Sequence, residues 1–555
     1  MYELGGNAID AGVASALAQA VLEYQDFGFG GEAPILIYSA LSRQVTVING
    51  NTRMPAAATA SWFHRNGIAL IPGDGFLPAG VCAAPDALVT ALSLYGRLGL
   101  KEVLAPAIEL AANGFPMYEG LRDRVVSCES RFRTEWPSSA ALFLPNDNVP
   151  AIGQIWKNPD LAQTFEKLIE AEHNARSRGR AGALRAARDR FYKGDIARVI
   201  VDFQRNTKVR DANGVESSGL LAAEDFAAFE TRVEGAVGVN YHGHDVYKCG
   251  PWSQGPVFLQ QLNLLERFDL RSMGHNSAEY IHAITEVAKL AFADRERYYG
   301  DPTASFVPLR GLLSKEYAAS RQGLVDLSTA SLELRPGNPY RYQGGSVSPE
   351  PVLGELQHWQ DGTTGTRAAD SDGNMFSAAP SGGWFQSSPV IPGLGFSLGT
   401  RGQMCRLDDS EHPAALRPRK QPRTTLSPSL VMKDGLPLMV FGSPGGDQQD
   451  QWTLQFFLNS VEFGMDVQDA IDAACFHSKH FPSSFYPKHA SPGELVVEAG
   501  IGSEVVAALV DRGHKVVTVP SSTINWTTAV VFHADGPYME GGASSRGERH
   551  YAIGW

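Results

Sequence analysis

Two adjacent threonines, Thr363 and Thr364, are the residues whose type and position best suit a nucleophile. They follow Gly362, and the sequence after them (TRAAD, SDGN, MFSAA) predicts a strand, a turn and a second strand. A threonine hydroxyl is a weak nucleophile that needs a base, and the free α-amine of a chain-terminal threonine can be that base. Thr363 gains this amine only by cleavage after Gly362. A Thr-Thr pair is also ordinary β-branched strand sequence, so the dipeptide alone leaves both interpretations open.

Two later segments hold groups that could serve such a nucleophile. Thr424 and Thr425 provide two adjacent hydroxyls before the predicted strand of LSPSLVMKDG. The segment FGSPGGDQQDQ predicts a strand, a glycine turn and the start of a helix. The backbone N–H groups of Gly445 and Gly446 in this turn could face a developing oxyanion, helped by the helix N-terminus. An ordinary tight connection uses the same glycines, so this interpretation also has a structural alternative.

The elements that must position these residues alternate between helix and strand. Residues 7–23 predict a helix of small residues, 34–50 a hairpin of β-branched strands, and about 80–330 a mainly helical region. Residues 330–362 are rich in Pro, Gly and Ser without periodicity, which is typical of a linker. After Thr363 the chain predicts strands, glycine turns and a helical pair. We therefore expect an α/β fold with helices outside strands from both halves of the chain.

The composition argues against several other classes of function. The chain has 555 residues, of which 19% are charged and 43% hydrophobic, and its net charge of −12 is spread thinly. Nucleic acid and anionic membranes are therefore not expected partners. The basic segment 172–190 is interpreted as a solvated helix face, with an anion contact as the alternative. No run of about 18 apolar residues occurs, so we expect no membrane-spanning helix.

The cysteines and the N-terminus bear on cofactors and location. Five cysteines lie far apart without a Cys-x-x-Cys pair, which gives no zinc or thioredoxin signature and, with an odd count, no complete disulfide framework. We expect no metal and no other cofactor. The sequence after Met1 is not that of a signal peptide, which favours a cytoplasmic protein by default. Alternatively the chain begins after a removed segment, because GGNAIDAGVASALAQAVL reads as a helix that began upstream.

Several segments, taken in order along the chain, match the pattern of one known family. The first are ELGGNAIDAGVASALAQAV, GFGGEAPILIY, GLLAAEDFAAFETRV, YHGHDVYKCGPWSQGPVFLQQLNLLE and AFADRERYYGDP. TTGTRAADSDGN matches a Thr-Thr-His segment that opens a small subunit after self-cleavage, and LSPSLVMKDG and GSPGGDQQ follow it. Over nearly its whole length the chain thus resembles the γ-glutamyltranspeptidases, members of the N-terminal nucleophile hydrolases. Each glycine motif is weak by itself, whereas the ordered set is specific.

The resemblance implies a role for each matching residue. Thr363 would direct self-cleavage and then act as the catalytic nucleophile. Ser381 falls where the family keeps a threonine that hydrogen-bonds the new amine of the nucleophile. The glycine pair of the GSPGG turn would form the oxyanion hole, and Thr424 and Thr425 would hold the substrate carboxylate.

The resemblance also implies the architecture and the partners. The expected fold is the four-layer αββα sandwich of the N-terminal nucleophile hydrolases, built as one intertwined domain from a large segment, 1–362, and a small segment, 363–555. The two fragments would stay associated after cleavage. The implied substrate is a small amide or peptide, either glutathione-like or another N-acyl compound.

The substrate-binding residues depart from the family pattern. The family arginine that grips the α-carboxylate of glutamate aligns near Asn51, and Arg53 is the nearest substitute. The acidic pair that binds the α-amine should follow the Gln-Met pair that begins at Gln403, but Cys405 and Arg406 stand there, and Asp408 and Asp409 are shifted along the chain. An arginine that faces a substrate ammonium would repel it. We expect Arg53 and Gln403 to contact the substrate, with an acyl group that need not be γ-glutamyl.

Two further departures lie close to the nucleophile. Gly365 replaces the family histidine and adds backbone freedom where a strained loop needs support. Trp384 and Phe385 suit a more apolar acyl group, or else they pack in the core. Three hypotheses remain: a processed γ-glutamyl hydrolase or transferase, a related acylase for another N-acyl substrate such as a dicarboxylic-acyl amide, and a homologue that never cleaves and is not an enzyme.

Cleavage between Gly362 and Thr363 is the first testable prediction. It gives fragments of about 39 and 21 kDa, in proportion to the 59.9 kDa of the whole chain. Intact mass spectrometry of the purified protein measures both fragments. A single 59.9 kDa species that persists for days at neutral pH and has no amidase activity would support the non-enzymatic alternative.

Overall fold

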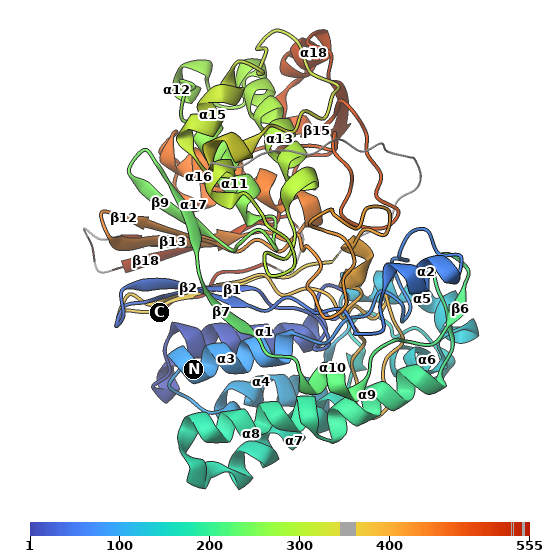
Figure 1. The fold of residues 1–555 in the computed structure, drawn as a ribbon. Helices are drawn as coiled ribbons and strands as arrows, with labels where there is room; N and C mark the ends of the chain where they lie inside the picture. The colour runs from blue at the N-terminus through green and yellow to red at the C-terminus, as the bar shows by residue number, and fades with distance from the viewer. Residues whose placement is uncertain (344–361, 534–535, 537, 547–549, 555) are drawn as a thin grey trace. The chain divides into compact units, whose positions relative to one another are not determined.

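The computed structural model describes residues 1–343, 362–533, 536, 538–546 and 550–554. Two compact units are present (Figure 1). Unit 1 consists of Met1–Glu234, Asp361–Ser410 and Ala415–Pro422, and unit 2 of Gly235–Gln360, Glu411–Ala414 and Arg423–Trp555. Each unit therefore takes chain from both sides of Thr363. The predicted cleavage point is not a boundary between compact units, and most of the predicted linker 330–362 lies outside the described residues.

Unit 1 is organised around a five-stranded sheet. Its strands, in spatial order, are β10 (Thr366–Ala369), β11 (Met375–Ala378), β1 (Ile35–Ser39), β2 (Gln44–Asn49) and β7 (Arg232–Gly235). β11 lies between β10 and β1 and pairs antiparallel with both, with Ala378 opposite Thr366 on one side and opposite Ile35 on the other. The hairpins predicted at 34–50 and after Thr363 are confirmed. Together they form one hydrogen-bonded surface from two distant parts of the chain.

Helices cover one face of this sheet. α1 (Ala8–Leu22) packs on β10 and β11, and α3 (Ala84–Tyr95) packs on β1 and β2 (Figure 1). The remaining helices of unit 1 are α2 (Ala60–Arg65), α4 (Leu100–Asn113), α5 (Glu119–Thr134), α6 (Pro137–Phe143), α7 (Pro159–Asn174), α8 (Gly179–Lys193), α9 (Asp195–Asn206) and α10 (Ala223–Ala227). Two short strand pairs, β3 (Phe115–Pro116) with β4 (Ile155–Trp156) and β5 (Val209–Arg210) with β6 (Glu216–Ser217), complete the unit.

Helix α1 begins inside the chain, so the expectation that its start lies upstream is wrong. The Asn7 side chain accepts hydrogen bonds from the backbone N–H groups of Ile9 and Asp10, and the Asp10 carboxylate accepts one from the Asn7 N–H. This reciprocal capping satisfies donors that a helix N-terminus otherwise leaves unpaired. The Asn-Ala-Ile-Asp sequence is the local signal for it.

Unit 2 has its own sheet and core. The sheet runs in the order β18 (Tyr538–Ala543), β17 (Thr528–His533), β13 (Leu436–Gly442), β12 (Ser429–Lys433), β9 (His244–Lys248) and β8 (Val237–Tyr241). The predicted Lys-Asp-Gly turn joins β12 to β13, with Asp434 and Gly435 at φ 52° and 75°, as a tight hairpin turn requires. A smaller sheet contains β14 (Phe476–Ser478), β15 (Glu494–Glu498) and β16 (Lys515–Val519).

The helices of unit 2 pack on these sheets and on one another. They are α11 (Gly255–Leu265), α12 (Leu270–Met273), α13 (Ala278–Tyr298), α14 (Leu309–Leu312), α15 (Lys315–Gln322), α16 (Gln449–Val461), α17 (Val467–Asp472) and α18 (Ser503–Asp511). α11 contacts β8 and β9, α16 contacts β13, and α17 contacts β17 and β18. The segment 232–248 forms β7, β8 and β9, although the sequence predicts a mainly helical region there. Its Val and Tyr residues alternate with polar ones, a period-2 pattern whose strand partners come from distant parts of the chain.

Two other sequence-based expectations concern surface properties. The basic segment 172–190 is only partly a solvated helix face, because Arg180 donates to the Leu98 carbonyl and the buried Arg188 pairs with Asp86 at 2.9 Å. Among the described residues, no helix is both long enough and apolar enough to cross a membrane.

The packing of α1 on β11 predicts an unusual effect of a glycine substitution. Gly12 lies against the Phe376 ring, and a Cβ atom there would overlap that ring. An alanine in a helix normally stabilises by about 1 kcal/mol relative to glycine. We expect Gly12→Ala instead to lower the free energy of unfolding by about 1–3 kcal/mol, because the overpacked helix must move from the sheet. Denaturant titration measures this.

A matched control comes from the same helix. Ala11 is part-exposed, so Ala11→Gly should show only the propensity cost of about 1 kcal/mol. A stabilising Gly12→Ala variant would contradict the close packing of α1 on β11.

Candidate active site

Thr363 extends the β10–β11 hairpin toward the N-terminal side of β10. An isolated bridge pairs Thr363 with Ser381, and another pairs Ser381 with Glu32. Both continue the register of the sheet, because Thr366 and Ile35 both lie opposite Ala378 three residues away. Directly opposed residues of antiparallel strands project to the same face. The register therefore places Thr363, Ser381 and Glu32 in one row.

The row lies on the sheet face opposite α1. Phe376 and Thr366 face that helix, through the contact with Gly12 and a hydrogen bond to Ser15. Side chains alternate between faces along a strand, so Thr363 and Ser381, each an odd number of residues away from these, project to the other face. All three residues of the row are buried.

The Ser381 hydroxyl is the centre of the site. It donates a hydrogen bond to the Gly362 carbonyl at 2.7 Å and lies 3.3 Å from the Thr363 hydroxyl. Arg401 donates to the same oxygen at 3.0 Å. The peptide bond that the sequence predicts to be cleaved, its expected nucleophile and Ser381 are thus in mutual contact. The pairing of Thr363 with Ser381 was expected from the family resemblance, whereas the contact with Arg401 was not.

Arg401 and Glu32 form an ion pair beside the nucleophile that sequence reasoning missed. Arg401 lies in a short 3-10 helix (Arg401–Met404), and its guanidinium is 3.2 Å from the Glu32 carboxylate, with both side chains buried. Burial raises the pKa of Glu32, while the adjacent guanidinium lowers it. The Trp384 ring lies against the guanidinium, 5.5 Å away. The sequence did contain a signal for this ion pair. Glu32 is the one acid in GFGGEAP, and an acid in a glycine-rich apolar turn needs a partner.

Gly365, the residue in place of the family histidine, makes room for Arg367. A Cβ atom at Gly365 would overlap the Arg367 guanidinium. Burial lowers the pKa of that guanidinium to about 9. Gly365 also keeps its carbonyl in contact with α1, where Gln19 donates to it at 3.1 Å. Gly365, two residues from Thr363, thus leaves space for the Arg367 guanidinium. The sequence had indicated only added backbone freedom at this position.

The residues expected to bind substrate have other partners in unit 1. Arg53 donates to the Glu230 carbonyl at 2.9 Å and places its guanidinium over Phe229. These contacts are with unit 1 groups other than Thr363 and Ser381, and the clamp role of Arg53 stays a prediction. Gln403 donates to the carbonyls of Gly73 and Thr400, both at 3.2 Å, which anchors the 3-10 helix.

Arg406 does not present an unbalanced charge. Its guanidinium makes two hydrogen bonds to the Asp408 carboxylate, at 3.0 and 2.6 Å. Asp408 thus neutralises Arg406, which stands where the family pattern has an acidic residue. The repulsion expected between Arg406 and a substrate ammonium is therefore reduced.

The other predicted site residues belong to unit 2. Thr424 is buried and bridges Ser253, and its N–H donates to the Trp252 carbonyl at 2.8 Å. Thr425 is also buried, and its hydroxyl has no hydrogen-bond partner. A buried hydroxyl without a partner is uncommon and suits a group that binds a ligand.

The glycine turn has the backbone that the oxyanion hypothesis needs. Gly445 and Gly446 have φ values of 121° and 55°, which other residues rarely adopt, and they lead into α16. A Cβ atom at Gly445 would overlap Trp452. Gln254 donates to the Gly446 carbonyl at 3.2 Å, which fixes the turn. The turn therefore requires glycine for structural reasons, and its oxyanion role stays a prediction.

The two aromatic residues near the site have different surroundings. Phe385 packs in the core of unit 1 with Tyr24 and Phe143 at ring distances of 5.7 and 4.3 Å. Trp384 donates to the Asp26 carbonyl at 2.7 Å and covers Arg401. Only Trp384 is adjacent to the charged groups of the site.

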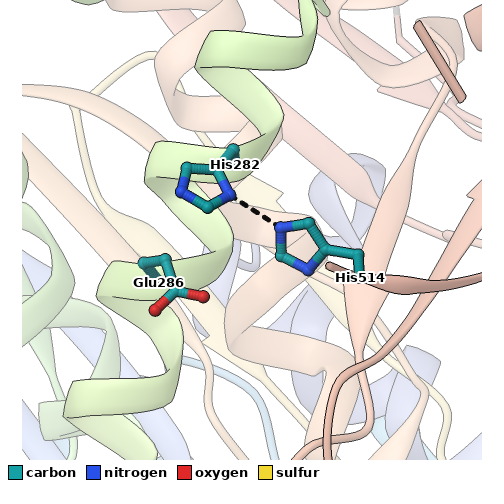
Figure 2. A group of neighbouring side chains, drawn as sticks. All are labelled: His282, Glu286 and His514. Atoms are coloured by element: carbon teal, nitrogen blue, oxygen red, sulfur yellow. Dashed lines mark hydrogen bonds between the residues drawn. The ribbon is translucent and has the colours of Figure 1, made fainter. Parts of the chain in front are cut away.

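A group of potential metal ligands lies elsewhere, in unit 2. His282 and Glu286 are one turn apart on α13, and His514 precedes β16 (Figure 2). All three are buried, and their ligand atoms lie within 4.8 Å of one another. The two imidazole nitrogens that face each other are 2.7 Å apart. Two nitrogens on one tetrahedral zinc would be separated by about 3.3 Å, given Zn–N distances of about 2.0–2.1 Å.

The hydrogen bonds of this group fit a network without a metal. His282 Nε2 contacts the Asp326 carbonyl at 2.7 Å, so this nitrogen carries the proton and Nδ1 accepts one from His514. Burial lowers the pKa of His514 to about 3, which keeps the ring neutral. Glu286 is bound by Lys289 and Arg335 at 2.5 and 3.2 Å. Lys289 and Arg335 already balance the Glu286 carboxylate, which is the one acid in this group of three. These residues therefore do not fit a divalent ion.

Comparison with known proteins gives a consistent result. The family model described as Gamma-glutamyltranspeptidase matches residues 1–554. The Glutathione hydrolase proenzyme of Bacillus subtilis (strain 168) is 29% identical over 98% of this chain and 87% of its own length. The solved structure of LmbA2991HD is 40% identical with a TM-score of 0.93, covering 100% of this chain and 95% of that one. The cephalosporin acylase structure from Bacillus halodurans is 28% identical with a TM-score of 0.82, covering 98% and 91%.

The histidine network yields a prediction about metal. We expect equimolar zinc to leave the Tm unchanged, because binding would have to break the 2.7 Å imidazole contact and bring a cation beside Lys289 and Arg335. Thermal unfolding with and without zinc measures this. His514→Gln is the control and should bind no less zinc than the wild type by mass spectrometry. Zinc that raises the Tm of the wild type but not of this variant would contradict the interpretation.

Proposed function

Because this chain belongs to the γ-glutamyltranspeptidase family, an amide-hydrolysing and acyl-transferring family of the α/β N-terminal nucleophile type, we propose that it becomes active by cleavage between Gly362 and Thr363. Thr363 then acts as the nucleophile in hydrolysis or transfer of an amide-linked acyl group. One observation carries the proposal: the Ser381 hydroxyl contacts both the Gly362 carbonyl at 2.7 Å and the Thr363 hydroxyl at 3.3 Å.

The first step is an acyl shift within the chain. The Thr363 oxygen attacks the Gly362 carbonyl carbon, the C–N bond to Thr363 breaks, and the hydroxyl proton passes to the departing nitrogen. Water then hydrolyses the resulting ester, which leaves a carboxylate on Gly362 and a free hydroxyl and α-amine on Thr363. The hydrogen bond from Ser381 stabilises the negative charge that develops on the Gly362 oxygen.

The proposed turnover uses the α-amine that cleavage would create. An α-amine has a reference pKa of about 7.7–8.0, so a substantial fraction of it is neutral near pH 7.5 and can take the proton of the Thr363 hydroxyl. The hydroxyl attacks the acyl carbon of the substrate, the amine leaves, and water or another amine releases the acyl group. The backbone N–H groups of Gly445 and Gly446 are the proposed oxyanion donors.

Two classes of acyl group are proposed for the substrate. A γ-glutamyl group follows from the family and from relatives such as the glutathione hydrolase. A dicarboxylic acyl group without an ammonium is the second candidate. It is supported by Cys405 and Arg406, which stand where the family pattern has an acidic pair, and by the acylase name of a structural relative.

The two fragments are proposed to remain together after cleavage. The strands on the two sides of Thr363 share hydrogen bonds, with β11 paired to β1 over four residue pairs. Cleavage breaks one peptide bond and none of these contacts. A tight complex of fragments is therefore the proposed active species.

Paired anilide substrates test the reaction and its acyl specificity. We expect release of aniline from glutaryl-anilide at a higher kcat/KM than from γ-glutamyl-anilide, because Cys405 and Arg406 replace the acids that would bind an ammonium in the family pattern. Thr363→Ala should abolish both cleavage and turnover, and Thr363→Ser should retain part of each because a hydroxyl remains.

Thr364→Ala is the matched control. Its side chain projects to the opposite sheet face from Thr363, so cleavage and turnover should be close to those of the wild type. Turnover by Thr363→Ala would exclude the proposed nucleophile, and a higher kcat/KM for γ-glutamyl-anilide would favour the first acyl class.

A further inference from the structure

We infer that Arg401, held in place by Glu32, is a positioning residue for self-cleavage that directs the Ser381 hydroxyl proton to the Gly362 carbonyl. This inference rests on the proposed function, because it assigns a role within the same cleavage reaction. It concerns two residues, Arg401 and Glu32, that lie outside both the Thr-Thr segment and the glycine turn.

The hydrogen-bonding capacity of one hydroxyl carries the inference. A serine hydroxyl has one proton to donate and two lone pairs that accept. An arginine can only donate, so the 3.0 Å contact from Arg401 occupies one lone pair of Ser381. The carbonyl of Gly362 can only accept, so the 2.7 Å contact uses the single Ser381 proton. The remaining lone pair accepts from the Thr363 hydroxyl at 3.3 Å.

Without Arg401 this arrangement is not determined. The Ser381 hydroxyl would be free to rotate and could donate to Thr363 instead, which would leave the Gly362 carbonyl without its donor. With Arg401 in place, the Thr363 proton points to Ser381 and a Thr363 lone pair is free for attack. A donor fixed before the reaction needs no reorganisation when charge develops on the carbonyl oxygen.

The surroundings hold Arg401 in this position. The Glu32 carboxylate lies 3.2 Å from the Arg401 guanidinium. The guanidinium also lies over the Trp384 ring. Two glycines leave space for the carboxylate: a Cβ atom at Gly382 would overlap Glu32, and one at Gly399 would lie 3.2 Å from its oxygen. Both side chains are buried, and Arg401 acts through its hydrogen bond to Ser381.

The chemistry explains why a cation is useful at this point. As the Thr363 oxygen bonds to the Gly362 carbon, the carbonyl oxygen gains negative charge while the C–N bond breaks and the nitrogen takes the proton. A hydroxyl that accepts from a charged donor is itself a stronger donor, since hydrogen bonds in a chain polarise one another. Arg401 therefore strengthens the Ser381 contact most when the oxyanion forms. After cleavage the Gly362 carbonyl departs, and the Ser381 proton becomes available to the Thr363 amine.

A double-mutant cycle on the full-length precursor tests the inference. Four proteins are compared: the wild type, Arg401→Met, Ser381→Ala, and the double variant. The cleavage rate of each is followed by intact mass spectrometry after rapid purification. We expect Arg401→Met to slow cleavage by about tenfold, less than the roughly 10²–10³-fold loss typical when an oxyanion donor is removed, because the Ser381 hydroxyl remains. If Arg401 acts through Ser381, the double variant should cleave no more slowly than Ser381→Ala alone.

Two milder variants and one control separate positioning from folding. Arg401→Lys keeps a charged donor and should restore part of the rate, and Glu32→Gln should slow cleavage less than Arg401→Met. Arg188 forms another buried ion pair in unit 1, with Asp86 at 2.9 Å. Arg188→Met should therefore lower the Tm without changing the cleavage rate of the folded protein. If Arg401→Met does not fold, Arg401→Lys and Glu32→Gln provide the comparison, each in the Ser381→Ala background.

The outcomes distinguish the two levels of inference. A wild-type chain that never cleaves would overturn the proposed function. A wild type that cleaves, together with Arg401 and Glu32 variants that cleave equally fast, would overturn the positioning role alone. Effects of Arg401 and Ser381 that multiply in the double variant would also overturn it, because a general structural defect is additive in free energy.

Discussion

The register of β11 between β10 and β1 is the constraint on which the site depends. Because Ala378 lies opposite both Thr366 and Ile35, the same strand aligns residues from the two ends of unit 1. A shift of one residue would turn every side chain to the other face of the sheet. The burial of Phe376 and Ile35 on the helix-covered face therefore determines that Thr363, Ser381 and Glu32 share the other one.

Glycines at the site leave space, where a side chain would otherwise lie, for neighbouring charged groups. Gly365 leaves the space that the Arg367 guanidinium occupies, and Gly382 leaves the space of the Glu32 carboxylate. Each glycine borders a buried charge, and buried charges need partners and close contacts to be tolerated. The glycine-rich segments are thus not only turns. They admit two charged groups, Arg367 and Glu32, into the polar surroundings of the expected nucleophile.

The polar groups of the site also account for its departures from the family pattern. The family places an acidic pair after the Gln-Met dipeptide, whereas here Arg406 occupies that place and is neutralised by Asp408. The acid and the arginine that do lie beside the nucleophile, Glu32 and Arg401, pair with each other. These two ion pairs balance the charges of both arginines within the chain.

Local patterns in the sequence determined the elements and the expected nucleophile. The β10–β11 hairpin follows from alternation and the Ser-Asp-Gly turn, and the Lys-Asp-Gly turn from the φ values that only such residues adopt easily. Family-like spacing identified Thr363 and paired it with Ser381. In contrast, the segment 232–248 was misassigned because its strand partners come from distant parts of the chain. The start of α1 was also misplaced, although the capping signal at Asn7 was present in the sequence.

Only the tertiary structure decided which charged residues surround the nucleophile. Arg53 was the arginine nearest to the family position, yet it contacts Glu230 and Phe229, and Arg401 contacts Ser381 instead. Glu32 and Arg401 are separated by 369 positions in the sequence. A long side chain can reach many partners, and which one it finds depends on packing and burial rather than on spacing along the chain. For this reason the sequence determined the expected nucleophile, while the fold determined which charged groups lie beside it.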